Sequence, residues 1–313
     1  MNCGKVPGNV LKRSVVNLIG KGPRTGIDSA GHRTDDGHLV LSSTQTGVMD
    51  SGISPILAVA KACNNILAAG GSVLGVSAAF LLSERTKERD LKNLTRQTMA
   101  GCRMYHTELS GGHTEVSDGV NRAMCTVTAV GYHKKDEILT VRDIVPGMDI
   151  IMTKWAGLEE AAILLNDNEH AVRLSERFSE YYMGLFEDYT QWLSIEHEAE
   201  IASQWGRVIM HDNSDGGVFA SLWDMAEGSG LGFEVDLRKI PVRQEIIELA
   251  YFSDRNIYRM KSSGSLMIVC DDGIRLCEVL KDNGIPASLI GKFTSNNDKL
   301  IHNEDEIRYL ERV

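Results

Sequence analysis

Aromatic residues and clusters of basic residues are scarce in this sequence, and each shortage narrows the possibilities. Phe, Trp and Tyr make up 6% of the 313 residues, while hydrophobic residues make up 42%. The core must therefore consist mainly of Ala, Val, Ile, Leu and Met. The net charge is −10, and basic residues form only short pairs such as Lys134-Lys135. Because nucleic-acid-binding domains usually present a basic face, we expect no nucleic-acid partner.

Long apolar runs and paired cysteines are also missing. The longest apolar run, around residues 73–82, has about half of the ~20 residues that span a bilayer. Residues 1–20 lack the apolar stretch of a signal peptide. The six cysteines form no Cys-x-x-Cys pair, and most lie in apolar segments. We therefore expect a cytoplasmic protein without a membrane segment, with buried thiols rather than disulfides or a zinc site.

Strand-like and helix-like segments alternate in both halves of the sequence. The predicted strands are 38–44, 72–82, 122–132, 149–153, 207–211, 231–236, 264–270 and 286–291. The predicted helices are 54–69, 86–107, 157–166, 169–193, 216–227, 243–252 and 273–283. This alternation favours an α/β (α+β) fold with helices packed on sheets. Pro146-Gly147 is typical of a turn, and it divides the chain into domains 1–147 and 148–313.

Three smaller features add to this outline. Ser54 is expected to cap the helix 54–69, with Pro55 at its first position. The polar stretch 166–204 is interpreted as a helical insertion or cap on the second domain, and Glu196-His197-Glu198 within it as a solvated face. Gly228-Ser229-Gly230 follows a predicted helix and precedes a strand, which is the reverse of a dinucleotide-binding loop, so we interpret it as a helix stop.

A glycine-rich segment in the first half combines several polar groups. Residues 110–116 are Ser-Gly-Gly-His-Thr-Glu-Val, and they are predicted to form a tight loop between a helix and a strand. Gly111 and Gly112 allow a ligand to approach the backbone closely. His113, Thr114 and Glu115 then offer a donor, a hydroxyl and a carboxylate. An ordinary turn with polar neighbours explains the segment equally well.

A second polar turn lies between a predicted strand and a predicted helix. Residues 211–217 are His-Asp-Asn-Ser-Asp-Gly-Gly. Backbone amides at a helix N-terminus attract anions, and Asp212 has the oxygen ligands that Mg²⁺ prefers. Capping of the helix by Ser214 or Asp215 is the simpler explanation. Capping accounts for one residue of the turn, so we favour a functional role.

These motifs occur together in the order found in one known superfamily. The elements that carry the resemblance are Gly26-Ile27-Asp28-Ser29-Ala30, a strand ending in Ser43-Thr44, a helix with Asn64-Asn65 and a following Gly-Gly turn, the 110–116 segment, Thr153 to Ala162, the 211–217 turn, Ile240-Pro241-Val242, Ser262 to Met267 and Ile290-Gly291-Lys292. The sequence resembles the aminoimidazole-ribonucleotide synthetase (AIR synthase)-related superfamily. Gly4-Lys5-Val6-Pro7 and residues 155–162 are most similar to the hydrogenase maturation factor HypE family.

The resemblance implies a fold, a ligand and an assembly. The fold would be an N-terminal domain with a four-stranded sheet and a C-terminal α/β domain, and the N-terminal sheets of a homodimer would join into a barrel. ATP would bind in a cleft, with Mg²⁺, and activate an amide, carbamoyl or similar oxygen by phosphorylation. Carried onto this chain, Asp28, Glu115 and Asp212 would be catalytic and metal or phosphate ligands. Gly111, Gly112, His113 and Thr114 would contact the nucleotide, as would the turn Ser214, Asp215, Gly216 and Gly217.

The sequence also departs from the family pattern. Family members usually have Asp after the Ser-Thr of the strand and Asn-Asp in the helix, whereas this chain has Gln45 and Asn65 at these expected metal positions. Each lost carboxylate weakens attraction for a cation, by ~4 kcal/mol at 4 Å with an effective dielectric constant near 20. The hydrogenase factor presents a terminal cysteine to a carbamoyl donor, whereas this sequence ends Tyr309-Leu310-Glu311-Arg312-Val313. We therefore do not expect that branch's own reaction.

Two hypotheses about function follow. In the first, the chain is an ATP-dependent enzyme that acts on a small molecule or on a group carried by a partner. In the second, it is a nucleotide-binding homologue with impaired catalysis that works as a scaffold or partner protein. Gln45 and Asn65 favour the second hypothesis, while Glu115 and Asp212 favour the first.

Overall fold

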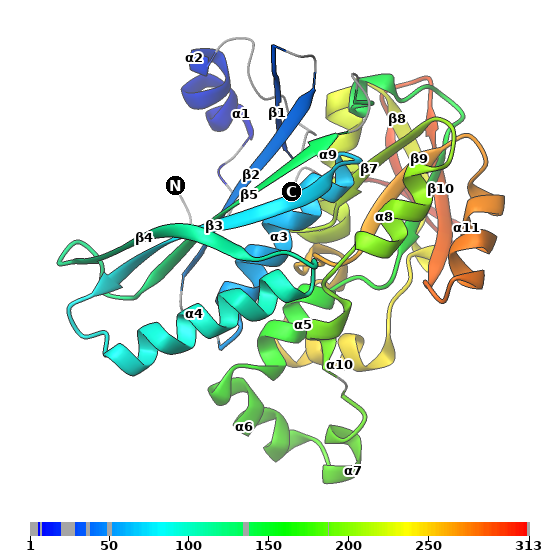
Figure 1. The fold of residues 1–313 in the computed structure, drawn as a ribbon. Coiled ribbons are helices and arrows are strands. Elements are labelled where there is room, and N and C mark those ends of the chain that lie inside the picture. Colours follow the sequence, from blue (N-terminus) through cyan, green and yellow to red (C-terminus); the bar gives the residue numbers. More distant parts are fainter. Residues whose placement is uncertain are drawn as a thin grey trace.

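The computed structural model describes residues 6, 8–19, 29–35, 38–48, 52–133, 138–186 and 188–311. In these residues a five-stranded sheet belongs to the N-terminal part and a seven-stranded mixed sheet to the C-terminal part, each with packed helices (Figure 1). The predicted mixed α/β, two-domain architecture is therefore confirmed. No helix in the described ranges has both the length and the apolarity needed to cross a bilayer.

The first sheet has five strands, not the four that were expected. Its order is β1-β2-β5-β3-β4, with β1 (Ala30–Arg33), β2 (Leu39–Val48), β3 (Ser72–Ser83), β4 (Leu109–Ser117) and β5 (Met124–His133). The short strand β1 adds the fifth position by pairing antiparallel with β2, from Ala30 opposite Ser42 to Arg33 opposite Leu39. A short helical stretch precedes it, made of α1 (Gly8–Leu11), a π-helical turn (Lys12–Val16) and α2 (Asn17–Ile19).

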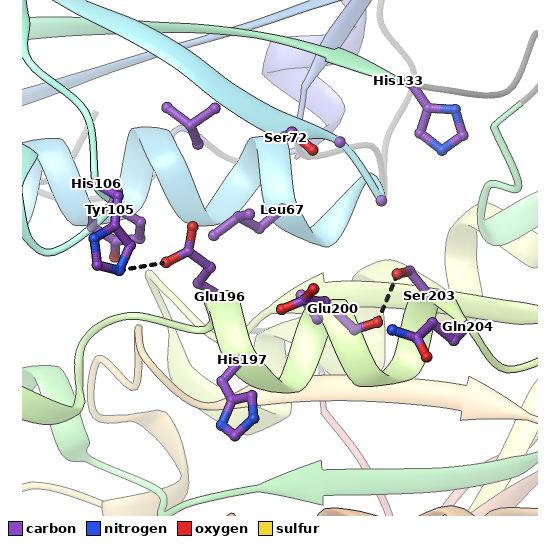
Figure 2. Close-up of a pocket in the computed structure, with 14 residues that line it drawn as sticks. Leu67, Ser72, Tyr105, His106, His133, Glu196, His197, Glu200, Ser203 and Gln204 are labelled. Carbon is purple, nitrogen blue, oxygen red and sulfur yellow. Dashed lines mark hydrogen bonds and ion pairs between the residues drawn. The ribbon is translucent and has the colours of Figure 1, made fainter.

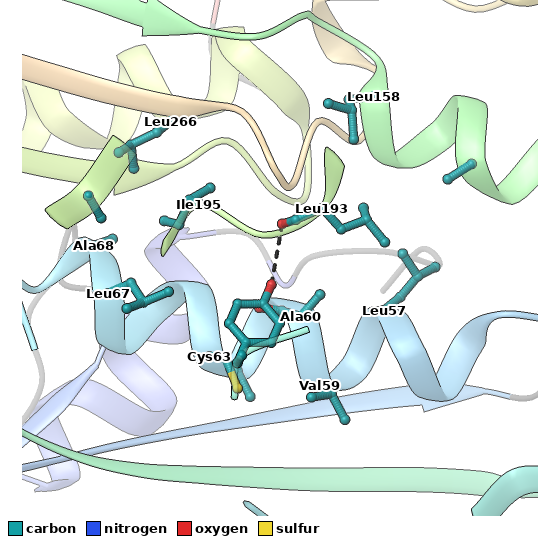
Figure 3. Packing of buried hydrophobic residues seen from close by; sticks show 14 of the residues in the cluster. Leu57, Val59, Ala60, Cys63, Leu67, Ala68, Leu158, Leu193, Ile195 and Leu266 are labelled. Carbon is teal, nitrogen blue, oxygen red and sulfur yellow. Dashed lines mark hydrogen bonds between the residues drawn. The ribbon is translucent and has the colours of Figure 1, made fainter. Parts of the chain in front are cut away.

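Helix α3 (Ser54–Ala68) lies between the two domains. It packs against β2, β5 and α4 (Glu88–Arg103) on one side. On the other side it packs against β7 (Val208–Asp212) and α8 (Glu196–Ser203) of the C-terminal part. Leu57, Cys63 and Leu67 of α3 are buried together with Leu193 and Leu266, and Figure 3 shows this packing. The sequence of α3 is apolar on nearly every side because both domains cover it. Ile53, not Ser54, occupies the N-cap position, and it makes no side-chain cap.

The second sheet has the order β12-β11-β8-β10-β6-β9-β7. Its strands are β6 (Asp149–Thr153), β7 (Val208–Asp212), β8 (Gly232–Asp236), β9 (Leu266–Cys270), β10 (Ala287–Thr294), β11 (Lys299–Asn303) and β12 (Glu306–Tyr309). The helices that follow or join them are α5 (Leu158–Leu165), α8 (Glu196–Ser203), α9 (Gly217–Ser229), α10 (Gln244–Phe252) and α11 (Gly273–Asp282). All five residues of β9 are buried, as expected for a strand covered on both faces. As predicted, α9 stops at Gly230, where φ is 73°.

The predicted helix 169–193 is broken into shorter pieces. These are α6 (Asn168–Arg177), α7 (Glu180–Met183) and a 3₁₀ turn (Tyr189–Trp192). Asp167, Ser179 and Asp188 each cap the piece that follows with their side chains. Repeated capping residues restart the helix several times, and the hydrophobic period alone did not reveal these breaks.

The domain boundary at residue 147 stays a prediction. A short 3₁₀ turn at Val141–Asp143 lies just before this boundary, and two others, Leu237–Lys239 and Ile257–Arg259, lie in the C-terminal part. Val141 and Ile144, which precede the predicted boundary, already pack into the hydrophobic cluster of the second sheet together with Met148. The hydrophobic core of the second sheet therefore includes residues that precede the predicted boundary.

Candidate functional site

A cluster of charged side chains lies where α3 faces the turn between β7 and α9. The Nζ atom of Lys61, on α3, lies 2.9 Å from Oδ1 of Asp215 and 3.4 Å from Oε1 of Glu159, which is on α5. Lys261 approaches Asp215 from outside, with Nζ and Oδ1 3.7 Å apart. The Lys61 side chain is 11% exposed and that of Asp215 is 43% exposed. The cluster thus runs from the buried domain joint to solvent.

Residues 211–217 form the turn that presents Asp212 and Asp215. Asp212 ends β7 and is buried, and its carboxylate accepts hydrogen bonds from the Ser263 hydroxyl (2.8 Å) and the Gly264 amide (3.3 Å). The neighbouring Asn213 is tied to the same segment, because its amide donates to the Ser265 carbonyl oxygen (3.1 Å). Hydrogen bonds from the segment 262–265 therefore hold the 211–217 turn in place, so the two sequence motifs form one structural unit.

The start of α9 is not capped by a side chain. Gly216 is the N-cap residue with φ of 86°, and the first helical residue, Gly217, has φ of 66°. The interpretation of Ser214 or Asp215 as capping residues is therefore wrong. A Cβ atom on Gly217 would lie 2.3 Å from the Met260 carbonyl oxygen, so the turn requires glycine for conformation and for space. Gly216 has no side chain to cap the helix, and the Gly217 amide donates to the Ser214 carbonyl oxygen (3.0 Å).

Asn64 and Asn65 point to different domains. Asn64 is fully buried, and its Nδ2 donates to the Leu193 carbonyl oxygen (2.9 Å), while its Oδ1 accepts from the Tyr105 hydroxyl (2.8 Å). Asn65 instead donates from Nδ2 to the Ser43 hydroxyl on β2 (2.9 Å). Asn64 therefore joins the domains, while Asn65, an expected metal position, is engaged within the first domain.

Gln45 lies on the face of β2 that is directed towards α3. Alternate residues of a strand share a face, and Ser43 and Gly47 on either side of Gln45 contact α3 near Asn65 and Ser54. Gln45 is half-buried and lies beside the middle of α3, the stretch that carries Lys61. Its role as a metal position stays a prediction.

The glycine-rich segment 110–116 is a strand, not the predicted loop. It forms most of β4, the edge strand of the first sheet, which pairs parallel with β3. Gly111, Gly112, His113, Thr114 and Glu115 are all exposed, and His113 Nε2 lies 3.3 Å from Glu115 Oε2. The segment escaped prediction as a strand because it lacks apolar alternation.

The structure does not bring Glu115 to Gln45 or Asp212 within one copy of the chain. In the sheet register Gln45 lies opposite Val127, which lies opposite Ala78, which lies opposite Gly112. Three strand spacings correspond to ~14 Å. Figure 1 shows β4 at the edge far from the C-terminal domain, where Asp212 is located. Asp28 lies outside the described residues. The roles of all these residues stay predictions.

The side chains near α3 do not form an obvious cation site. Within the described ranges, no three His, Cys, Asp or Glu side chains converge as metal ligands. Both Asp212 oxygens already accept hydrogen bonds, Asn65 is engaged with Ser43, and the Lys61 ammonium lies between Glu159 and Asp215. The residues present therefore do not fit a Mg²⁺ ion at this joint.

The charges of this cluster affect one another strongly. Burial alone would lower the pKa of Lys61, but the carboxylates of Glu159 and Asp215 and the hydrogen bond to Asp215 raise it above its ordinary value. Burial raises the pKa of Glu159 despite the adjacent Lys61 charge. Lys61 is therefore an ammonium ion at neutral pH, and its charge opposes the effect of burial on the pKa of Glu159.

Sequence reasoning missed Lys61 and Glu159 as members of the site. Lys61 is the one charged residue in the segment 54–68, and a lone charge in an apolar helix was a usable signal. It also missed Glu198, which was interpreted as solvated. Glu198 is buried and its Oε1 lies 2.8 Å from Nζ of Lys154.

A separate cleft opens at the other end of α3. It has a volume of about 700 Å³ (Figure 2). The end of α3 and the start of β3 form one wall, and helix α8 forms the other. His106, His133, Glu196 and His197 line it, and His106 Nε2 lies 3.7 Å from Glu196 Oε2 across the two domains.

Family models match most of the chain. The N-terminal domain model of AIR synthase related protein matches residues 25–133, and the C-terminal domain model matches residues 145–303. A putative hydrogenase expression/formation protein of Methanocaldococcus jannaschii is 23% identical over 273 residues, covering 86% of this chain and 77% of that protein. The carbamoyl dehydratase HypE of Rhizobium leguminosarum bv. viciae is 22% identical, covering 89% and 80%.

Solved structures share the fold. The HypE–HypF complex structure aligns with a TM-score of 0.79 at 19% identity, covering 97% of this chain and 99% of that chain. HypE in complex with ATP gives 0.73 at 17% identity, covering 100% and 96%. ThiL complexed with AMPPCP and TMP gives 0.72 at 16% identity, covering 97% of each chain.

Proposed function

This chain belongs to the AIR synthase related protein family, and on that premise we propose that it binds ATP at the joint between its two domains. The observation that carries the proposal is the uncapped start of α9 beside Lys61, Lys261 and Asp212. Amides at a helix N-terminus bind phosphate oxygens, and the two lysines add positive charge. The similar folds of HypE with ATP and ThiL with AMPPCP support a nucleotide as the ligand.

The proposed reaction is phosphorylation of an oxygen on a small molecule or on a protein-borne group. The γ-phosphoryl group would pass from ATP to an amide, carbamoyl or similar oxygen, ADP would be released, and the phosphorylated oxygen would become a good leaving group. Asp28, Glu115 and Asp212 are the proposed catalytic acids. Gly111 to Thr114 and Ser214 to Gly217 are the proposed nucleotide contacts.

A catalytically impaired scaffold is the second candidate. Asn65 is held by Ser43 and carries no charge, and Gln45 beside it is also an amide. Both features reduce the capacity of this site to hold the metal that phosphoryl transfer commonly uses.

We also propose that the first domain forms a homodimer through β4. All residues from Ser110 to Val116 are exposed, although edge strands with free backbone groups usually need cover. A second copy placed along β4 would cover this edge. Because Glu115 lies on β4, such a dimer would bring the Glu115 of one copy towards the other copy. This would give a role to a motif that lies far from Asp212 within one chain.

Calorimetric titration of ATP, with and without Mg²⁺, tests the nucleotide proposal. We expect ATP to bind with weak dependence on Mg²⁺ and to be hydrolysed slowly or not at all. Gln45→Asp combined with Asn65→Asp should make binding dependent on Mg²⁺, and Asp212→Asn in that background should abolish the gain. Absence of ATP binding would overturn the proposal. Strong Mg²⁺-dependent turnover by the unmodified protein would show that positions 45 and 65 are not metal positions.

A further inference from the structure

The Lys61 ammonium is enclosed by carboxylates from the opposite domain. It projects from α3 and contacts Asp215 at 2.9 Å and Glu159 at 3.4 Å. Asp212 is near enough for its charge to act on Lys61 as well. Two carboxylates of the C-terminal domain thus contact one positive charge supplied by the N-terminal domain, and the charge of Asp212 adds to their effect.

Glu159 needs a positive partner. Its side chain is 2% exposed, and among the described residues its Oε2 atom has no hydrogen-bond partner. An uncompensated buried carboxylate is strongly unfavourable. Proteins meet such a need either with a bound cation or with a basic side chain, and at this joint the basic side chain is present.

We infer that the Lys61 ammonium takes the place of a divalent cation between Glu159 and Asp215, and thereby closes the joint to metal. Hard divalent cations bind carboxylate oxygens at 2.0–2.6 Å, which requires the space that Nζ fills at 2.9 Å from Asp215. The fixed positive charge also repels a second cation. The inference concerns the nucleotide-free protein, so it does not depend on the proposed binding of ATP.

The neighbouring positions agree with this assignment. Asn65 lies one helical turn after Lys61 on α3, and Gln45 lies beside the same stretch on β2. Neither adds a carboxylate that would draw in a metal ion. Lys261 differs from Lys61, because it lies 3.7 Å from Asp215 and is 44% exposed. Water screens its charge, so it serves as a matched control.

Binding of Mn²⁺ to the purified protein, followed by electron paramagnetic resonance, tests the inference. The variants are Lys61→Ala, Lys61→Arg and Lys261→Ala, and the melting temperature of each is measured with and without Mn²⁺. We expect Lys61→Ala to bind Mn²⁺ at least about tenfold more tightly than the unmodified chain, which corresponds to ~1.4 kcal/mol. Mn²⁺ should also raise its melting temperature. Lys61→Arg and Lys261→Ala should behave like the unmodified chain.

Two further arms keep the outcome decisive. Lys61→Ala combined with Glu159→Gln should lose the gain in Mn²⁺ affinity, because the buried carboxylate is gone. If Lys61→Ala is recovered only unfolded, it is refolded with and without Mn²⁺, and refolding that requires Mn²⁺ supports the inference. The inference is overturned if Lys61→Ala binds Mn²⁺ no more tightly than the unmodified chain, or if Mn²⁺ fails to restore folding.

Discussion

The buried ion pair between Lys154 and Glu198 allows a quantitative prediction about the stability of the C-terminal domain. Nζ of Lys154 lies 2.8 Å from Oε1 of Glu198, and the two side chains are 5% and 2% exposed. Lys154 also donates to the carbonyl oxygens of Trp192 (3.1 Å) and Ser194 (2.5 Å). Lys154→Met keeps the length of the side chain and removes the charge and the donors.

The expected loss of stability is large. With Lys154 changed, the Thr153 hydroxyl, 3.2 Å from Oε1 of Glu198, is the remaining hydrogen-bond donor to this carboxylate among the described residues. Removal of one member of a buried ion pair costs about 3–5 kcal/mol. Residue 154 has φ of 51°, a conformation that Met and Lys adopt with similar difficulty, so the backbone contribution cancels. We therefore expect the free energy of unfolding to fall by ~3–5 kcal/mol.

Urea denaturation followed by circular dichroism measures this loss in a double-mutant cycle with Glu198→Gln. The double variant should lose less than the sum of the single variants, because neither group is then left alone. The control is Lys92→Met, which breaks an exposed pair with Glu88 (2.6 Å) and should cost less than about 0.5 kcal/mol. If Lys154→Met costs no more than Lys92→Met, the buried pair does not stabilise the C-terminal domain.

Three other predictions follow from the same structure. In urea denaturation, Asn64→Ala should lower the free energy of unfolding by ~3 kcal/mol and Asn65→Ala by ~1 kcal/mol. The reason is that the Asn64 side chain makes hydrogen bonds with Leu193, Tyr105, Ile195 and Ser263, whereas that of Asn65 bonds only with Ser43 in the described structure. Equal losses would contradict this. Gly112→Ala should abolish the proposed dimer in light scattering and Gly111→Ala should not, because a Cβ at residue 112 would lie 1.8 Å from the Ala78 carbonyl oxygen, whereas one at residue 111 meets nothing within 4 Å. Burial raises the pKa of Cys102, Cys125 and Cys277 to about 11, so their thiolate fraction at pH 8 is ~0.001. A thiol reagent at pH 8 should therefore label at most one of the six cysteines in the native protein, and faster labelling of several would disprove the burial.

The sequence predicted those elements whose pattern is set by local burial. The strand 149–153 was predicted with its observed bounds, and α3 was predicted within one residue, because continuous apolar segments between turn residues leave few alternatives. β1, β4, β11 and β12 were not predicted as strands. β4 and β12 are exposed along nearly their whole length, so no buried face marks them as strands, and their strand form depends on pairing with β3 and β11.

The candidate site was predictable only in part, for a related reason. The 211–217 turn was found because Asp, Ser and Gly at the start of a helix are a local signal. The partners of Lys61 are 98 and 154 residues away in the chain, and no local pattern encodes such a pairing. The prediction of a loop at 110–116 was wrong because glycine favours loops locally, whereas here Gly112 allows β4 to lie close to β3.

The charge balance at the joint connects the altered positions 45 and 65 with Lys61. The described cluster contains three carboxylates, from Glu159, Asp212 and Asp215, and two ammonium groups, from Lys61 and Lys261, which leaves a net charge of −1. Aspartates at positions 45 and 65 would make it −3 and would require a metal ion. An aspartate at position 65 would also lie one helical turn from Lys61, where i and i+4 side chains meet, and would compete with Asp215 for it. The Lys61 ammonium and the uncharged amides of Gln45 and Asn65 therefore fit together in one charge balance. Changing only the lysine or only the amides should leave a charge at this joint without a partner.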